Sequence, residues 1–119
     1  MEPDSVTGVG PGEKVHVITR RLFDGDVRRH FAGECTKVAG NTMRVEGYAF
    51  VFDATKNAYE RRPDKRTCVF SLSDGNLIIT VLPSEVEIES LQYVVVNNRL
   101  LVTDGKSLSL DINEFGVRS

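Results

Sequence analysis

The sequence predicts an all-β fold, an antiparallel meander of about eight to ten short strands. Three observations support this prediction. Beyond residue 12, apolar residues recur at every second position in short runs, and Gly, Asn and Asp residues interrupt these runs. The connections mostly span about two to five residues, which is too short for the crossover that parallel strands require. Because strand twist accumulates, we expect the meander to form a closed or half-open barrel or a two-layer sandwich.

The chain is expected to begin with a flexible tail. Residues 1–12 contain three Gly and two Pro but few apolar residues, so they have little surface to bury. Residues 13–119 are predicted to form a single β domain, because the whole chain of 119 residues has the size of one domain.

The first part of this domain should consist of strands joined by tight turns. Hairpin turns often need positive φ angles, which Gly, Asn and Asp tolerate best. Such residues recur as Asp24-Gly25-Asp26, Gly40-Asn41, Thr55-Lys56-Asn57 and Asp74-Gly75-Asn76. The alternating segments around them predict six strands: Lys14–Phe23, Val27–Val38, Thr42–Phe52, Ala58–Arg62, Thr67–Leu72 and Leu77–Leu82.

The last part of the domain shows the same pattern. The turn signals Asn97-Asn98 and Asp104-Gly105-Lys106 separate three further alternating segments. We therefore expect strands at Tyr93–Asn97, Leu100–Thr103 and Ser107–Ile112.

Residues 84–91 have features of both a helix and a strand. Ser84 stands three residues before Glu87, as in the capping box that starts many helices. Acidic residues nevertheless alternate with Val86 and Ile88, which is typical of a strand with one wet face. The alternation therefore favours a strand, rather than a helix, at residues Val86–Ser90.

Residues 46–52 read E-G-Y-A-F-V-F and contain three aromatic rings. Residues 47–51 resemble the strand of the RNA-recognition motif on which nucleotides stack. That motif also requires two helices behind its sheet, whereas the turn after Phe52 leads into another predicted strand. The segment is therefore predicted to be a central strand, with Tyr48, Phe50 and Phe52 on one face. These rings line the core, a cavity for a small apolar ligand, or the surface that meets a partner.

Charge is distributed unevenly along the chain. Residues 13–66 contain 12 Lys or Arg and 8 Asp or Glu, whereas residues 67–119 contain 3 and 7, in a chain of net charge −2. Cations that follow phosphates and rings that stack on bases are typical of a groove for single-stranded RNA or DNA. Exposed cations equally suit pairing with an acidic protein surface. The candidate binding residues are Arg20, Arg28, His30, Tyr59, Arg61, Arg62 and Arg66.

No motif in the sequence points to catalysis, a metal or a cofactor. His16 and His30 lie in no nucleophile, acid-base or H-E-x-x-H pattern, and their spacing to Cys35 and Cys68 matches no compact zinc site. Neither a secretory signal nor an apolar run of roughly 20 residues, as a membrane span needs, is recognisable. We expect a cytoplasmic protein that is not an enzyme; the sequence leaves open whether the two cysteines pair.

The sequence therefore favours a non-catalytic interaction module that binds a protein partner or another copy of itself. The basic and acidic parts of the chain allow head-to-tail or isologous pairing. Two alternatives are binding of single-stranded nucleic acid by the Arg-rich strands and carriage of a small apolar ligand.

Overall fold

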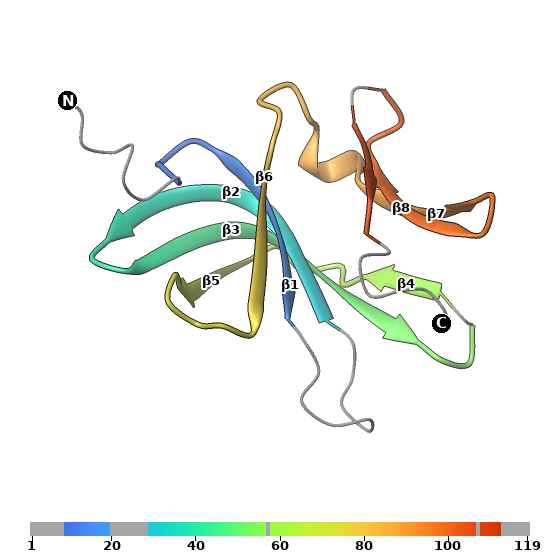
Figure 1. The fold of residues 1–119 in the computed structure, drawn as a ribbon, viewed down its shortest axis with the longest axis horizontal. Coiled ribbons are helices and arrows are strands. Elements are labelled where there is room, and N and C mark those ends of the chain that lie inside the picture. The colour runs from blue at the N-terminus through green and yellow to red at the C-terminus, as the bar shows by residue number, and fades with distance from the viewer. Residues whose placement is uncertain (1–8, 20–28, 57, 107, 113–119) are drawn as a thin grey trace. The chain divides into compact units, whose positions relative to one another are not determined.

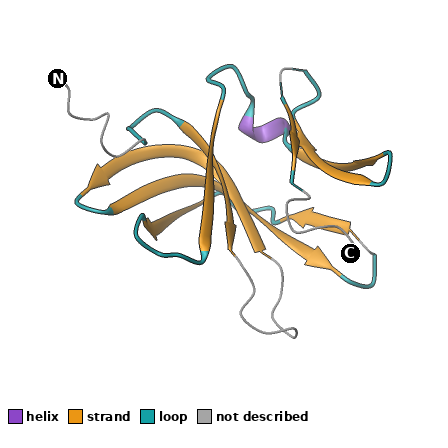
Figure 2. Cartoon of the chain, viewed as in Figure 1, coloured by secondary structure: helices purple, strands orange, loops and turns teal. Residues whose placement is uncertain are grey.

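The structure is a computed structural model that describes residues 9–19, 29–56, 58–106 and 108–112. The chain forms two compact units, residues 1–82 and residues 83–119. Among the described residues every element is a strand except one short 3-10 helix (Figure 1, Figure 2). The predicted all-β antiparallel fold is confirmed.

The first unit is one six-stranded sheet with the order β4-β3-β2-β1-β6. From β1 to β4 this order is the expected meander. β5 pairs with β3 instead of β4, because β3 is long enough for two partners on one edge: residues 42–47 pair with β5 and residues 50–53 with β4. β6 then pairs with β1, and no ladder between the described strands β5 and β6 closes the sheet. The strands are β1 (Lys14–Thr19), β2 (Arg29–Ala39), β3 (Thr42–Asp53), β4 (Ala58–Arg61), β5 (Arg66–Ser71) and β6 (Leu77–Leu82).

The predicted connection between the first two strands is only partly visible. The described part of β1 ends at Thr19 and that of β2 begins at Arg29. The Asp24-Gly25-Asp26 turn and the strand ends expected at Phe23 and Val27 lie outside the described residues.

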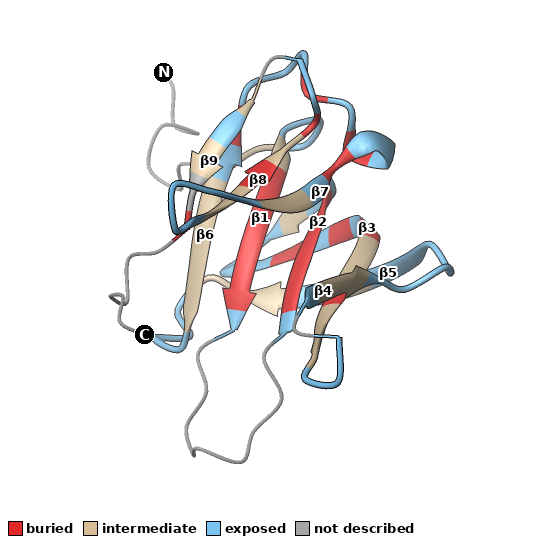
Figure 3. Ribbon diagram, turned by 90° about the vertical axis from the view of Figure 1, so that its right-hand side faces the viewer, coloured by how far each residue is buried: buried red, intermediate tan, exposed pale blue. Residues whose placement is uncertain are grey.

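One face of this sheet carries the hydrophobic core of the unit. The core residues alternate along β1, β2 and β3, as expected for strands with a buried face. Residues 15–18 of β1 and 30–33 of β2 are buried on both faces, which gives these strands the continuous buried stretches in Figure 3. Phe70 of β5 adds to this face, with its ring centroid 5.7 Å from that of Phe31. Both cysteines are free thiols, Cys35 buried and Cys68 half-buried. The buried cluster consists of Val15, Val17, Phe31, Cys35, Met43 and Val45.

Two glycines face each other in the ladder between β2 and β3. Gly33 and Gly47 are direct partners. A Cβ at Gly33 would overlap the carbonyl oxygen of Glu46, and a Cβ at Gly47 would overlap that of Ala32. Because these neighbours are backbone atoms, no side chain fits at either position. Strand packing therefore accounts for the glycine in the segment that resembles the RNA-recognition motif.

The second unit is a three-stranded sheet with the order β7-β8-β9. Its strands are β7 (Gln92–Val96), β8 (Arg99–Thr103) and β9 (Ser109–Asp111). Asn97 and Asn98 form the predicted turn between β7 and β8, with φ angles of 53° and 65°. Asparagine tolerates this left-handed region better than most residues, so the turn residues match the turn geometry.

Asp104 is a buried carboxylate that organises the second unit. Its Oδ1 accepts hydrogen bonds from the backbone N–H groups of Lys106, at 3.0 Å, and Leu108, at 3.1 Å. Its Oδ2 accepts one from the N–H of Glu87, at 3.2 Å. One side chain thus connects the turn between β8 and β9 to the segment that precedes β7.

The strand predicted over Val86–Ser90 is wrong. Residues 83–91 contain a turn and the 3-10 helix η2 (Ile88–Ser90). The N–H of Val86 bonds locally to the carbonyl of Pro83, and the N–H of Glu87 bonds to Asp104. These backbone groups are therefore not available for a β-ladder. The alternation of apolar and acidic residues instead reflects which side chains the turn buries.

Candidate protein-interaction surface

The aromatic strand β3 places its three rings on the face opposite the buried cluster. The register pairs Phe50 with His30 of β2, and Phe52 with Tyr59 of β4. Phe50 is only 2% exposed, whereas Tyr48 and Phe52 are half-buried. The rings of Phe52 and Tyr59 meet edge to face with centroids 5.3 Å apart. The shared face predicted for these rings is confirmed, and it is not the face that carries the buried cluster.

Two buried histidines extend this group of rings across β2 and β1. The ring centroid of His30 lies 4.7 Å from that of Tyr59, and His16 meets His30 edge to face at 5.3 Å. Burial of His16 lowers its pKa from 6.5 to about 4, because the charged imidazolium loses its hydration. His16 is therefore neutral at pH 7. His30 is 7% exposed, so it offers little surface to a partner.

Arg61 is the predicted cation that lies beside the aromatic rings. It pairs with Phe50 in the register of β3 and β4, which places it on the aromatic face. Its guanidinium carbon lies 4.7 Å from the ring centroid of Tyr48. Such a cation–π contact is worth about 0.5–1 kcal/mol at an exposed site.

The other predicted arginines do not join Arg61 on this face. Arg62 follows it directly and therefore points away from it. Arg66 pairs with Gly47, whose position in β3 belongs to the core-facing set. Both side chains are exposed. Arg20 and Arg28 lie outside the described residues.

A β-bulge in β2 creates a pair of neighbouring cations that the sequence analysis did not identify. The register pairs Cys35 with Val45 and then Lys37 with Arg44, so Thr36 is the extra residue. Without the bulge, alternation would place Lys37 on the core face; with it, Lys37 lies directly opposite Arg44 on the other face. The Thr36 hydroxyl donates a hydrogen bond of 3.3 Å to the backbone oxygen of Arg44. Bulges commonly redirect side chains in this way next to functional sites.

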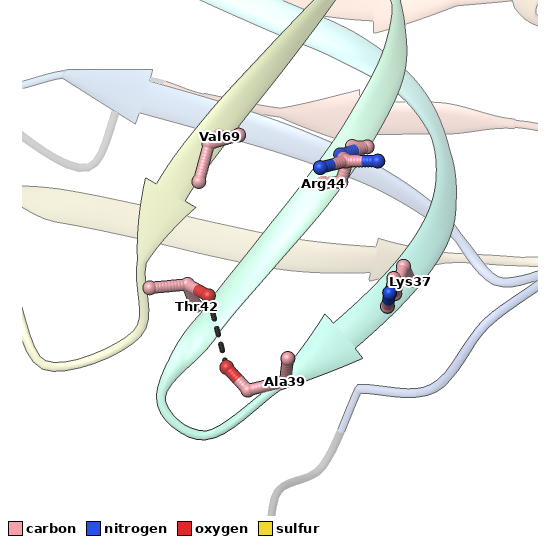
Figure 4. A pocket seen from close by; sticks show the side chains of 5 residues that line it. All are labelled: Lys37, Ala39, Thr42, Arg44 and Val69. Atoms are coloured by element: carbon pink, nitrogen blue, oxygen red, sulfur yellow. Dashed lines mark hydrogen bonds between the residues drawn. The ribbon is translucent and has the colours of Figure 1, made fainter.

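The two cations border a shallow pocket of about 120 Å³ (Figure 4). Its other lining residues are Ala39, Thr42 and Val69. The Thr42 hydroxyl donates a 2.9 Å hydrogen bond to the carbonyl of Ala39 at the end of the β2–β3 hairpin. Val69 pairs with Arg44 across β3 and β5 and is 61% exposed. This set of five residues, which we call the hairpin pocket, combines two positive charges with an exposed apolar wall.

Like charges face each other twice on this part of the sheet. Lys37 lies opposite Arg44, and Glu34 lies opposite Glu46 in the adjoining stretch of the same two strands. Like charges directly opposite each other destabilise a sheet. The ion pairs that the structure describes lie elsewhere, after β3 and in the second unit. The strand pair therefore has a positive stretch near the hairpin and a negative stretch at its middle, and a partner of opposite polarity would relieve both repulsions.

Only one feature of the sequence points to the hairpin pocket, a change in the spacing of core-facing residues along β2. Its members come together through the pairing of β2 with β3 and of β3 with β5, which local alternation does not determine. The spacing of core-facing residues in β2 does change, from two between Phe31 and Gly33 to three between Cys35 and Val38. Such a break in period is the signal by which the bulge could have been found.

Comparison with protein families, curated proteins and solved structures found no match. In the part of the chain that the structure describes, no helix is long and apolar enough to cross a membrane. Nor does the described part place three or more His, Cys, Asp or Glu residues where they could hold a metal ion. Function must therefore be inferred from the geometry of the surface.

Proposed function

We propose that this chain is a non-catalytic interaction module that binds an acidic segment of a partner protein at the hairpin pocket. The observation that carries this proposal is the bulge-aligned pair of Lys37 and Arg44 beside the exposed side chain of Val69.

A carboxylate suits the hairpin pocket on electrostatic grounds. Placed between Lys37 and Arg44, it removes their mutual repulsion and accepts charge-assisted hydrogen bonds from both. The planar guanidinium of Arg44 can bind a carboxylate through two parallel hydrogen bonds. The Val69 wall adds apolar contact, at about 25 cal/mol for each Å² removed from water. Because both cations are exposed, these contacts mainly determine partner choice and association rate.

The neighbouring glutamates restrict the partner. Glu34 and Glu46 lie on the same face as the two cations, so a second acidic group beside the first would meet two negative charges. We therefore expect a segment with one acidic residue for the pocket and neutral, apolar or basic residues next to it. This pattern disfavours a uniform polyanion as the ligand of the hairpin pocket.

Fluorescence anisotropy with two labelled peptides tests the proposal. One peptide carries a single Glu flanked by Val and Lys, and the other carries Gln in place of Glu. We expect the Glu peptide to bind at least about tenfold more tightly, which corresponds to about 1.4 kcal/mol. The double variant Lys37→Glu/Arg44→Glu should lose this preference, whereas Arg62→Glu, a charge reversal at an exposed site off this face, should keep it.

Two results would count against the proposal. One is equal binding of the Glu and Gln peptides by the natural chain. The other is an unchanged preference in the double variant while circular dichroism shows that the variant is folded.

Single-stranded nucleic acid is a second candidate because of a separate observation. The guanidinium of Arg61 lies over the ring of Tyr48, and Tyr59 contacts Phe52 on the same face. Rings and cations in such proximity are what base stacking and phosphate contacts require. Titration with labelled oligonucleotides should give binding that weakens as salt rises and that the Tyr48→Ala variant reduces. Binding that is absent, or that salt does not affect, would eliminate this candidate.

A further inference from the structure

We infer that β7 is a self-association edge, through which two copies of this chain pair antiparallel into one continuous sheet. β7 belongs to the second unit and the hairpin pocket to the first. The inference therefore does not rest on the proposed function.

β7 lacks the features that keep sheet edges apart. The order β7-β8-β9 leaves one side of β7 without a ladder partner among the described strands (Figure 1). Native edge strands usually carry charges, proline or a bulge that prevents pairing with another chain. β7 reads Q-Y-V-V-V and has none of these. Val95 is 71% exposed and Val96 is 47% exposed.

The other edges in the described part of the chain are better protected. β4 carries Glu60 and Arg61, β5 carries Arg66, and Val69 is the one large apolar side chain of these two strands that is largely exposed. β9, at the far side of the same sheet, is only three residues long. β6 is also an uncharged edge strand, but its side chains are buried or half-buried except for Val81, which is 41% exposed. β7 is therefore the edge on which pairing would remove the most exposed apolar side chain from water.

Charges near the two ends of β7 favour a second copy in the antiparallel orientation. Glu85, Glu87 and Glu89 precede the strand and are exposed, and Lys106 pairs with Glu87 at 2.9 Å. Arg99, also exposed, follows the turn at the other end. Antiparallel pairing brings the acidic end of one copy toward Arg99 of the other, whereas parallel pairing would bring like charges together.

Antiparallel pairing of one strand with itself also closes the assembly. It is isologous, so each copy uses its single β7 edge and no β7 edge is left for a third copy. A register centred on Val94 sets Tyr93 opposite Val95 of the second copy. Aromatic residues opposite β-branched residues are stabilising cross-strand pairs, and the backbone groups of both edges gain hydrogen bonds.

Sedimentation velocity of the full chain over a wide concentration range tests the inference. We expect the mass to rise from one copy to two and then to stay constant. Val95→Lys adds a charge at a largely exposed position and should keep the chain monomeric. Val69→Lys, the same change at a similarly exposed valine of the first unit, and Val81→Lys, on the other uncharged edge, should both leave the dimer intact.

Several results would overturn the inference. They are a natural chain that stays monomeric at high concentration, a Val95→Lys variant that still dimerises, a Val81→Lys variant that loses the dimer, and a mass that grows beyond two copies. Binding of the Glu peptide by the monomeric Val95→Lys variant should be unchanged. Sedimentation thus tests the dimer and peptide binding tests the proposed function, so that either one can be refuted without the other.

Charge reversals test the orientation separately. Arg99→Glu alone and Glu89→Lys alone should each weaken the dimer by roughly fivefold or more, because like charges then meet across the pair. Combined in one chain, the two changes should restore most of the affinity. A combined variant as weak as the single ones, with its circular dichroism spectrum unchanged, would overturn the antiparallel orientation.

Discussion

Gly47 has no room for a side chain, because the carbonyl oxygen of Ala32 occupies the place where a Cβ would stand. The same is true of its ladder partner Gly33. In the sequence, Gly47 is only one of the residues that resemble a nucleotide-stacking strand. The close approach of β2 and β3 gives it a structural role that needs no ligand.

We expect Gly47→Ala to lower the free energy of unfolding by about 3 kcal/mol or more, because backbone atoms of β2 must shift to admit a methyl group. Gly75→Ala is the matched control: a Cβ there meets nothing within 4 Å, so the change should stay within about 0.5 kcal/mol. Chemical denaturation followed by circular dichroism measures both values. Equal losses in the two variants would contradict this account.

His16 should make the stability of the fold depend on pH. Its pKa is about 4 in the native state and 6.5 otherwise, so between these values the unfolded chain binds a proton that the native chain does not. The contribution of His16 to the free energy of unfolding therefore falls as the pH drops from 6.5 to about 4, by at most about 1.4 kcal/mol per pH unit. Above pH 6.5 it is constant. Denaturation of His16→Leu across this range should show a shallower slope, and an unchanged slope would show that another group is responsible.

Among the elements, the predicted strand bounds agree best with the structure where a strand lies next to a predicted turn. β6 spans Leu77–Leu82 as predicted, because Asp74-Gly75-Asn76 precedes it and Pro83 ends it. β7 and β8 begin one residue earlier than expected, on either side of the predicted Asn97-Asn98 turn. The segment Val86–Ser90 differs because its backbone bonds to Asp104 and to its own turn. Local turn hydrogen bonds and one bond to the side chain of a distant residue together give it this structure.

The turn between β7 and β8 gives a prediction about backbone strain. Asn98 has a φ angle of 65°. Asn98→Val places a β-branched side chain in this left-handed region and should cost about 1–3 kcal/mol. Asn98→Gly suits the turn and should be neutral or slightly stabilising. Thermal unfolding of both variants measures the difference, and a valine variant as stable as the glycine variant would contradict the assigned turn.

Asp104 gives a second prediction at this scale. Asp104→Ala removes the acceptor of three backbone N–H groups, so the free energy of unfolding should fall by at least about 2 kcal/mol. Asp104→Asn keeps one oxygen for Lys106 and Leu108 but turns an amide N–H₂ group toward the N–H of Glu87. Its free energy of unfolding should therefore lie between those of the natural chain and the alanine variant. Hydrogen exchange of these three amides locates the effect. Protection that survives in the alanine variant would refute the role given to this carboxylate.

At the scale of the whole molecule, the two units differ in their balance of positive and negative residues. Residues 1–82 contain 12 Lys or Arg and 11 Asp or Glu, whereas residues 83–119 contain 3 and 6. The first unit carries the hairpin pocket and the second carries the uncharged β7 edge. The two proposed interactions therefore differ in their physical basis, one mainly electrostatic and the other mainly apolar with backbone hydrogen bonds.

Salt should distinguish these two interactions. Raising the ionic strength from about 0.01 to about 1 M shortens the screening length from about 30 to about 3 Å. Binding of the Glu peptide should then weaken strongly, whereas the β7 dimer should weaken much less because its central strand carries no charge. Anisotropy and sedimentation measured in the same buffers compare the two. A dimer that is as sensitive to salt as the peptide complex would contradict the assignment of β7 as its centre.

The sequence by itself determined which segments are strands, apart from Val86–Ser90, where most turns fall, and that Tyr48, Phe50 and Phe52 share a face. These properties depend on side-chain alternation and turn chemistry, which act over a few residues. Only the tertiary structure decided that Lys37 meets Arg44, that β5 pairs with β3, and that Gly33 meets Gly47. Each of these depends on the register between segments far apart in the chain, and a single bulge residue, Thr36, changes which side chains share a face.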